Sequence, residues 1–215
     1  MPSASELDAV TIDAFGTLVE LHDPVAALSG ALGRHGVERP PETVARAFRA
    51  EIAYYLPHSH EGRAGEGLLA LRIECARVFL ETADAPVEPA DFVDDFVGSL
   101  AFRPLPGAAE ALARLRAAGL TLACVANWDA SLAEFLAGAE LAWRFDAVVS
   151  AAEVGAQKPD PRIFTHALAV LGVSAARALH IGDLDADRKG AAAAGLAFEP
   201  VPLATLPRRL GLGGP

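Results

Sequence analysis

Lysine and cysteine are scarce in this sequence of 215 residues. Lys158 and Lys189 are the only lysines, against sixteen arginines, and Cys75 and Cys124 are the only cysteines. Two cysteines so far apart cannot form a disulfide framework, so we expect both to be buried thiols. A coding preference for arginine explains few lysines in general. A lysine kept in a loop, as Lys158 is, therefore becomes a candidate functional residue.

Positive charge is also in deficit, because 18 basic residues stand against 28 acidic ones and leave a net charge of -10. Such a balance argues against nucleic acid and anionic membrane surfaces as general partners. No run of about 18 apolar residues is present, and residues 1–6 lack the basic and then apolar pattern of a secretory signal. We therefore expect a cytoplasmic protein that binds neither membranes nor nucleic acid.

The composition is that of a folded protein, with 52% hydrophobic and 21% charged residues. The length suits one Rossmann-like core of about 130 residues and a small accessory domain. Short apolar segments alternate with helical patterns of about ten residues, which indicates βαβ units. We predict an α/β fold with a parallel sheet and helices on both faces, with strands at 9–12, 120–126, 147–150, 178–181 and 197–201 and core helices at 108–118, 130–138, 161–171 and 187–194.

The first predicted strand ends in the most informative segment, residues 13–18, with the sequence DAFGTL. A carboxylate at the end of a buried strand has its backbone fixed by the sheet and faces the crevice where open α/β sheets bind ligands. Asp13 is therefore a candidate nucleophile for an electrophile such as a phosphoryl group. Gly16 allows the chain to turn sharply behind it.

Two later segments strengthen this interpretation. Residues 154–161 (VGAQKPDP) form a turn-rich loop that contains Lys158 and leads into a predicted helix. Residues 178–187 (ALHIGDLDAD) form a short apolar strand that ends in three closely spaced carboxylates. Because clustered carboxylates repel one another unless a cation neutralises them, this cluster predicts a Mg²⁺ site with oxygen ligands.

Together the three segments resemble the haloacid dehalogenase-like superfamily, in particular its phosphatase-type members with an inserted α-helical cap. The resemblance implies that Asp13 is the nucleophile and that Lys158 steadies both the nucleophile and the substrate phosphate. It implies a Mg²⁺ ion held by Asp13, Asp183 and Asp187. The expected activity is hydrolysis of a small organic phosphate through an aspartyl intermediate.

The cap is expected between the first motif and the rest of the core. Helical periodicity runs almost unbroken through this region, with candidate helices at 25–35, 41–55, 67–82 and 89–101. The sequence RPLPG at 103–107 then has the composition of a hinge. We predict a core formed by residues 1–19 and 103–215 and an inserted cap formed by residues 20–102.

Two motif positions depart from the family pattern. Phe15 stands where the phosphatase branch usually carries a second Asp that protonates the leaving group, a loss worth roughly 10²- to 10⁴-fold in rate. Ala126 replaces a Ser or Thr that binds phosphoryl oxygens, a loss of about 1.5 to 3 kcal/mol. We expect the backbone N–H of Asn127 to compensate in part, as a substrate-binding group. Asp129, two residues further on, precedes a predicted helix, as an N-cap residue would.

The acidic segment is also irregular. Asp183 and Asp187 are four residues apart, one fewer than is common in the family. This spacing leaves Asp185 as a rival to Asp187 for the second metal carboxylate.

The cap contains an unusual polar segment, residues 54–63 (YYLPHSHEGR), between two predicted helices. If it faces the nucleophile, His58, His60 and Arg63 become substrate-binding residues. One of the imidazoles, or Glu61, would then supply the proton transfer that Phe15 cannot. A solvated polar turn is the simpler alternative.

Two other functions stay open beside the phosphatase. Phe15 mildly favours 2-haloacid dehalogenation, in which an aromatic residue occupies this position and no metal is needed, but Asp183 would repel a haloacid. Two losses in one active site would also fit a catalytically silent binding module. The sequence leaves the substrate and the oligomeric state undetermined.

Overall fold

Five parallel strands form the central sheet of the computed structural model, which describes residues 2–213. They are β1 (Ala9–Ile12), β4 (Thr121–Ala126), β5 (Ala147–Ser150), β6 (Ala178–Gly182) and β7 (Ala197–Pro200), in the order β5-β4-β1-β6-β7. All five predicted strands are present. The predicted α/β fold with a parallel sheet is confirmed.

Strand β1 lies in the middle of the sheet, and side chains on both of its faces are buried. All four of its residues are buried. Val10 and Ile12 pack into the cluster on one face, and Ala9 packs into the cluster on the other. A strand of this kind needs helices on both sides, which is typical of parallel sheets.

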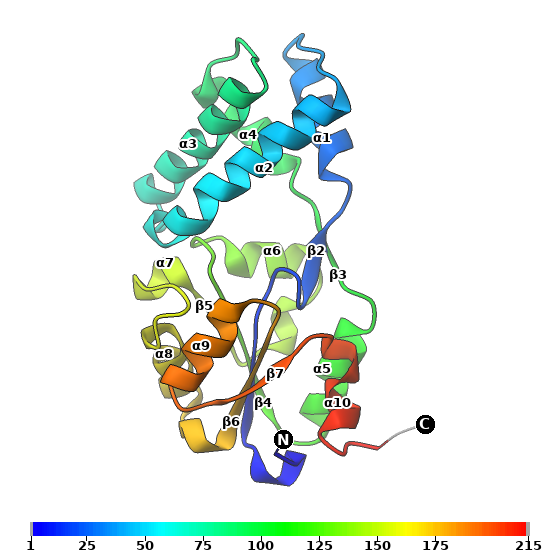
Figure 1. Cartoon of the computed structure of the whole chain (residues 1–215), viewed down its shortest axis with the longest axis vertical. Coiled ribbons are helices and arrows are strands. Elements are labelled where there is room, and N and C mark those ends of the chain that lie inside the picture. The colour runs from blue at the N-terminus through cyan, green and yellow to red at the C-terminus, as the bar shows by residue number, and fades with distance from the viewer. Residues whose placement is uncertain (1, 214–215) are drawn as a thin grey trace.

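Helices cover both faces of the sheet (Figure 1). One layer contains α5 (Ala108–Ala117), α6 (Leu132–Gly138) and α10 (Leu206–Arg209), whose leucines join the first cluster. The opposite layer contains α7 (Ala151–Val154), α8 (Arg162–Leu171) and α9 (Asp185–Ala193). In the part of the chain that the structure describes, no helix combines the length and the apolar character needed to cross a bilayer.

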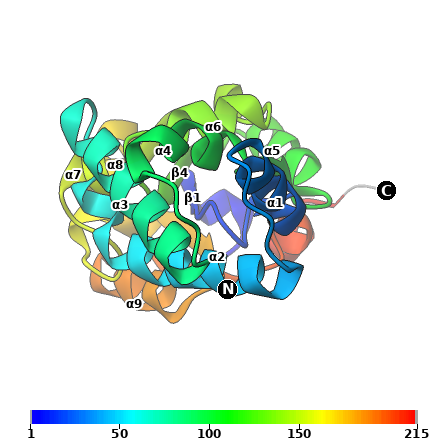
Figure 2. The same cartoon turned by 90° about the horizontal axis from the view of Figure 1, so that it is seen from above.

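Four helices lie together beyond the carboxyl ends of the strands, α1 (Pro24–Arg34), α2 (Pro41–His58), α3 (Glu66–Thr82) and α4 (Pro89–Gly98) (Figures 1 and 2). They have a hydrophobic core of their own. At its centre the Phe79 ring lies 5.9 Å from the Phe92 ring and 5.5 Å from the Phe96 ring. This separate core is what an inserted helical unit requires.

The chain enters and leaves the helical unit through a pair of short strands that were not predicted from the sequence. β2 (Val19–Leu21) pairs antiparallel with β3 (Phe102–Pro104), and Arg103 Nε lies 2.8 Å from Glu20 Oε1. The predicted hinge is thus partly a strand. The predicted domain boundaries at 19/20 and 102/103 fall inside this pair of strands, and the domain division stays a prediction. Residues 1 and 214–215 of the predicted core lie outside the described residues.

Several element boundaries differ from prediction. α2 runs three residues past the predicted end and continues into a 3-10 turn (Ser59–Glu61), so much of the polar cap segment is helical. α6 begins at Leu132, with Ser131 and not Asp129 as its N-cap residue. The side chain of Asp129 instead accepts a hydrogen bond from the Ser131 N–H at 2.8 Å. The N-cap interpretation of Asp129 is therefore wrong.

We predict that Phe79→Ala destabilises the helical unit by about 3 to 5 kcal/mol, because Phe79 is fully buried among other rings and leaves a cavity. Chemical denaturation followed by circular dichroism measures the loss. Leu69→Ala on the same helix is the control, since Leu69 is 52% exposed. Equal losses in the two variants would contradict the packing described above.

Candidate active site

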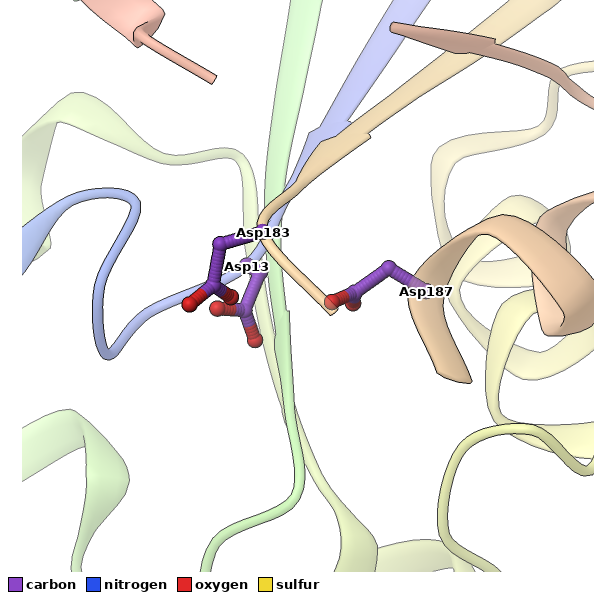
Figure 3. Close-up of side chains that lie close together, drawn as sticks. All are labelled: Asp13, Asp183 and Asp187. Atoms are coloured by element: carbon purple, nitrogen blue, oxygen red, sulfur yellow. The ribbon is translucent and has the colours of Figure 1, made fainter. Parts of the chain in front are cut away.

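Three neighbouring strands end at the same edge of the sheet, and each is followed at once by a residue singled out in the sequence. Asp13 follows β1, Asn127 follows β4 and Asp183 follows β6. β1 lies between the other two, so the three residues meet in the crevice beyond the carboxyl ends of the strands. Figure 3 shows Asp13 and Asp183 projecting from this edge, with Asp187 beside them.

Asp13 is held from two sides. Its Oδ1 lies 2.5 Å from Nζ of Lys158, and its Oδ2 accepts a hydrogen bond from the Thr17 hydroxyl at 3.2 Å. Its own N–H donates to the Ile181 carbonyl at 3.0 Å. Burial raises the pKa of the Asp13 carboxyl, and the ammonium group of Lys158 opposes that rise. The carboxyl group is thus fixed in place next to one cation.

Lys158 links two carboxylates. Besides Asp13, its Nζ contacts Asp187 Oδ1 at 2.6 Å and donates to the Val125 carbonyl at 3.0 Å. Burial alone would lower the pKa of Lys158, but the charges of Asp13 and Asp187 outweigh it and raise the pKa above its ordinary value. Lys158 therefore stays charged.

Asn127 holds the Lys158 backbone in position. Its Oδ1 accepts from the Lys158 N–H at 2.7 Å, and its Nδ2 donates to the Lys158 carbonyl at 3.1 Å. One Nδ2 hydrogen is thus used, and the backbone N–H of Asn127 donates to no acceptor within residues 2–213. This N–H and the second Nδ2 hydrogen remain available for a substrate oxygen.

Asp187 has no free oxygen. Its Oδ1 takes Lys158 and also the Nε2 of His180 at 2.9 Å, and its Oδ2 accepts the Leu184 N–H at 3.0 Å. Burial would raise the pKa of Asp187, but the hydrogen bond from His180 and the charge of Lys158 outweigh it and lower the pKa. On this geometry Asp187 orients Lys158.

Asp183 is the exposed member of the acidic group. Carboxylate oxygens of Asp13, Asp183 and Asp187 lie within 4.8 Å of one another. Partial burial and the charge of Asp187 raise the pKa of Asp183. Gly16 is needed beside it, because its φ is +81° and a Cβ there would lie 2.4 Å from Asp183 Oδ2.

The charges of this group suit a divalent cation. Three carboxylates against one ammonium group leave two negative charges, and burial lowers the pKa of His180, so that His180 adds no positive charge. Oxygen ligands of this kind favour Mg²⁺. Each oxygen of Asp13 and of Asp187 already accepts at least one hydrogen bond, whereas Asp183 accepts none from another residue within residues 2–213, so Asp183 fits a direct role best. The predicted ligand set of Asp13, Asp183 and Asp187 stays a prediction.

The helical unit contacts the core directly above this site. The Tyr55 hydroxyl accepts a hydrogen bond from the Asp129 N–H at 3.0 Å and donates to its Oδ2 at 3.3 Å. The Gly62 carbonyl accepts the Ala130 N–H at 2.9 Å. The cap segment therefore packs on the loop that follows β4.

The polar cap residues predicted to bind substrate do not line the cavity between the helical unit and the core. His58, His60 and Arg63 are absent from its lining, whereas Tyr55 is part of it. His58 Nδ1 lies 2.7 Å from the Tyr54 carbonyl, and Arg63 lines a separate groove. A substrate-binding role for these three residues stays a prediction.

The cavity itself is apolar and has a volume of about 130 Å³. Phe15 and Asn127 line it from the core, and Glu51 lines it from α2. Glu51 is 5% exposed, and burial raises its pKa to about 7, an effect that the Cys75 thiol partly offsets. Arg72 also borders the cavity without contributing to this shift.

A family model described as haloacid dehalogenase-like hydrolase matches residues 7–195. The chain therefore belongs to the haloacid dehalogenase-like hydrolases, and it has the fold and the strand-end aspartate of that enzyme class described above. The predicted family is confirmed.

Known relatives have different activities. The chain is 36% identical over 191 residues to haloacid dehalogenase-like hydrolase domain-containing protein 3 of Mus musculus (83% of this chain, 74% of the relative). It is 31% identical over 202 residues to a phosphoglycolate phosphatase of Caulobacter vibrioides (91% and 80%). The solved L-2-haloacid dehalogenase from Xanthobacter autotrophicus is similar with a TM-score of 0.66 and 27% identity (97% and 84%).

Sequence reasoning missed four residues of this region. Thr17 lies four residues after Asp13 in the first motif, so its place there was a usable signal. His180 reads as part of an apolar strand, and Glu51 reads as an ordinary position of a helix. Tyr55 lies in the polar segment 54–63 but was not among its substrate-binding candidates. Their roles depend on contacts between segments that are far apart in the sequence.

We predict that Glu51→Gln changes the pH dependence of stability. In the unfolded chain Glu51 loses its proton near its ordinary pKa of 4.5, whereas the folded protein keeps it until about pH 7. The folded state therefore binds more protons in this window, and the wild type loses up to about 3 kcal/mol as pH rises through it. Denaturant titrations at several pH values should show this loss removed in the variant.

Glu42→Gln is the matched control, because Glu42 is exposed on the same helix. It should keep the wild-type slope. An unchanged slope in Glu51→Gln would show that Glu51 is not buried as described.

Proposed function

We propose that this chain is a Mg²⁺-dependent hydrolase that cleaves a small organic phosphate through a phosphoryl-aspartate intermediate on Asp13. The observation that carries the proposal is the excess of two negative charges in the group formed by Lys158 and the three carboxylates of Asp13, Asp183 and Asp187. An anionic substrate would be repelled from such a site unless a divalent cation were bound. The phosphatase among the relatives agrees with this activity.

The reaction has two displacements at phosphorus. A carboxylate oxygen of Asp13 forms a bond to phosphorus while the bond to the leaving oxygen breaks, and the electron pair departs with that oxygen. Water then attacks phosphorus, and the bond to Asp13 breaks. Inorganic phosphate and the free carboxylate result, and the proton of the water passes to solvent.

Each nearby residue has a part in these steps. Lys158 orients Asp13 and balances negative charge on the phosphoryl oxygens. The N–H of Asn127 donates to one of those oxygens. Asp13 and Asp183 would hold Mg²⁺, which supplies further positive charge to the phosphoryl group when bound. Asp187 keeps Lys158 in place.

The leaving group must depart without help from position 15. Phe15 cannot donate a proton, and this absence costs roughly 10²- to 10⁴-fold for an alcohol that is a poor leaving group. An aryl phosphate loses a stable phenolate and hardly needs the proton. The site is therefore best suited to activated esters.

A second candidate is 2-haloacid dehalogenation, which Phe15 and the apolar cavity favour. Asp13 would then attack the carbon that carries the halogen, halide would leave with the bonding electrons, and water would hydrolyse the ester. The unneutralised charge of Asp183 near an incoming carboxylate disfavours this reaction.

The proposal includes the predicted cellular setting and domain division. The substrate is a phosphorylated small molecule, the protein is cytoplasmic, and residues 20–102 form a cap over the core of residues 1–19 and 103–215. Nucleic acid and membranes are not partners, given the acidic net charge of -10.

We predict that the wild type with Mg²⁺ releases phosphate from 4-nitrophenyl phosphate and that Asp13→Asn lowers kcat by at least about 10³-fold, because the nucleophile is lost. Phosphate release measures both. Asp8→Asn is the control, since Asp8 precedes β1, pairs with Arg177 and should leave kcat unchanged. Halide release from 2-chloropropionate without metal, in place of phosphate release, would establish the second candidate and refute the first.

We predict that Asp183→Asn raises the Mg²⁺ concentration needed for half-maximal activity by about 10- to 100-fold, because one of two charged ligands is lost. Activity measured against Mg²⁺ concentration gives this value. Asp185→Asn is the matched control two residues away, because Asp185 is exposed and pairs with Arg188 and Lys189. Equal Mg²⁺ requirements in the two variants would refute the role of Asp183 as a metal ligand.

A further inference from the structure

The cavity between the helical unit and the core is the right size for one aromatic ring. Its volume is about 130 Å³, and a cavity of roughly 150 Å³ with apolar walls can hold benzene. Rings from both parts of the chain line it, Phe48 and Phe96 from the cap helices and Trp128 and Phe135 from the core. Flat apolar walls of this kind suit an aromatic guest in offset or edge-on contact.

Asp13 is not part of the cavity lining, but two residues close to it are. Phe15 is two residues after Asp13, and Asn127 is hydrogen-bonded to the Lys158 backbone. Phe15 and Asn127 both line the cavity. A phosphoryl group at Asp13 would therefore have its organic part directed between Phe15 and Asn127 into the cavity. The walls are mostly apolar, so a sugar would leave most of its hydroxyl groups there unpaired, at a cost of about 1 to 3 kcal/mol for each unpaired group.

Glu51 is the acidic residue that the cap helices contribute to the lining, beside the polar Tyr55 and Arg72. It lies one helical turn before Tyr55, whose hydroxyl reaches Asp129 of the core, so Glu51 is further from the core along α2. Its side chain is buried, and neither Arg72 nor Asp129, which line the same cavity, pairs with it. A buried carboxyl group of this kind needs hydrogen-bond partners, and within residues 2–213 the Cys75 thiol is the one partner of Glu51 that the structure records.

We propose that this cavity binds the aromatic ring of an aryl phosphate and that Glu51 selects rings with a hydrogen-bonding substituent at the end away from the phosphate. The assignment of the ring to a substrate rests on the proposed phosphatase activity at Asp13. It agrees with Phe15, since a phenolate leaves without the proton that Phe15 cannot give.

Ring binding can be tested without turnover. The chain has two tryptophans, and Trp128 lines the cavity whereas Trp143 is 70% exposed. The NMR signals of the two indole N–H groups, assigned with Trp143→Phe, are followed while phenol or glycerol is added. Phenol should shift the Trp128 signal and leave the Trp143 signal in place, and glycerol should shift neither. Equal effects of the two ligands on Trp128, or no effect of phenol, would overturn the proposal.

A variant pair tests the location of the ring. Ile52→Phe fills part of the cavity and should weaken phenol binding by about tenfold or more. Leu69→Phe, at an exposed position of α3, should leave it unchanged. Equal phenol affinities in these two variants would place the ring elsewhere, and the ligand series on the wild type decides the proposal even if Ile52→Phe does not fold.

The role of Glu51 is tested with two ligands of nearly the same shape, 4-(hydroxymethyl)phenol and 4-ethylphenol. The wild type should prefer the hydroxymethyl compound by about tenfold, because its hydroxyl group satisfies Glu51. Glu51→Leu should prefer the ethyl compound, and Glu51→Gln should keep the wild-type preference. A purely structural role for Glu51 would change both affinities together and leave the preference intact, which would refute its part in selection.

Turnover separates this proposal from the one on which it rests. Acetyl phosphate is activated and too small to fill the cavity, so its hydrolysis by the wild type reports on Asp13 alone. If acetyl phosphate is hydrolysed and phenyl phosphate has no higher kcat/KM than glycerol phosphate, the ring proposal fails while the phosphatase proposal stands. If acetyl phosphate is not hydrolysed, the phosphatase proposal fails, and the aryl phosphate assignment fails with it.

Discussion

The contact of one ammonium group with two buried carboxylates is the interaction on which the candidate active site depends. Lys158 lies between Asp13 and Asp187 with both distances near hydrogen-bond length. Either carboxylate alone in this position would be costly to bury in charged form. The arrangement in turn needs Asn127 to fix the Lys158 backbone, and it needs the hydrogen bond from His180 to Asp187. Three neighbouring strands therefore share one polar network at their ends.

The sequence predicted the parts of the fold that local pattern controls. Alternation of short apolar segments with helical segments located all five parallel strands, because burial on both faces leaves a nearly continuous apolar signature. The strand ends then located Asp13 and Asp183 in one crevice, since the carboxyl ends of parallel strands share an edge. Lys158 lies in a loop after α7, and the family resemblance of that loop predicted its place at the site.

Contacts between distant segments were beyond the sequence. The short strands β2 and β3 have only three residues each, too few for a periodic signal, and the Pro and Gly around 103–107 suggested a hinge. Asp129 precedes a helix as a cap residue does, yet Tyr55, 74 residues away, takes its N–H. The orientation of the polar cap segment 54–63 depends on where α2 ends. The helix continues to His58, three residues past the predicted end, and this extension sets which side chains line the cavity.

The two strands that join the helical unit to the core lie side by side, β2 on the way in and β3 on the way out. The segment of eighty residues between them thus begins and ends at nearly the same point in space. Evolution can lengthen, shorten or exchange that segment without cutting the sheet or moving its catalytic edge. New substrate preferences can arise on this scaffold while the bond-breaking chemistry is inherited intact.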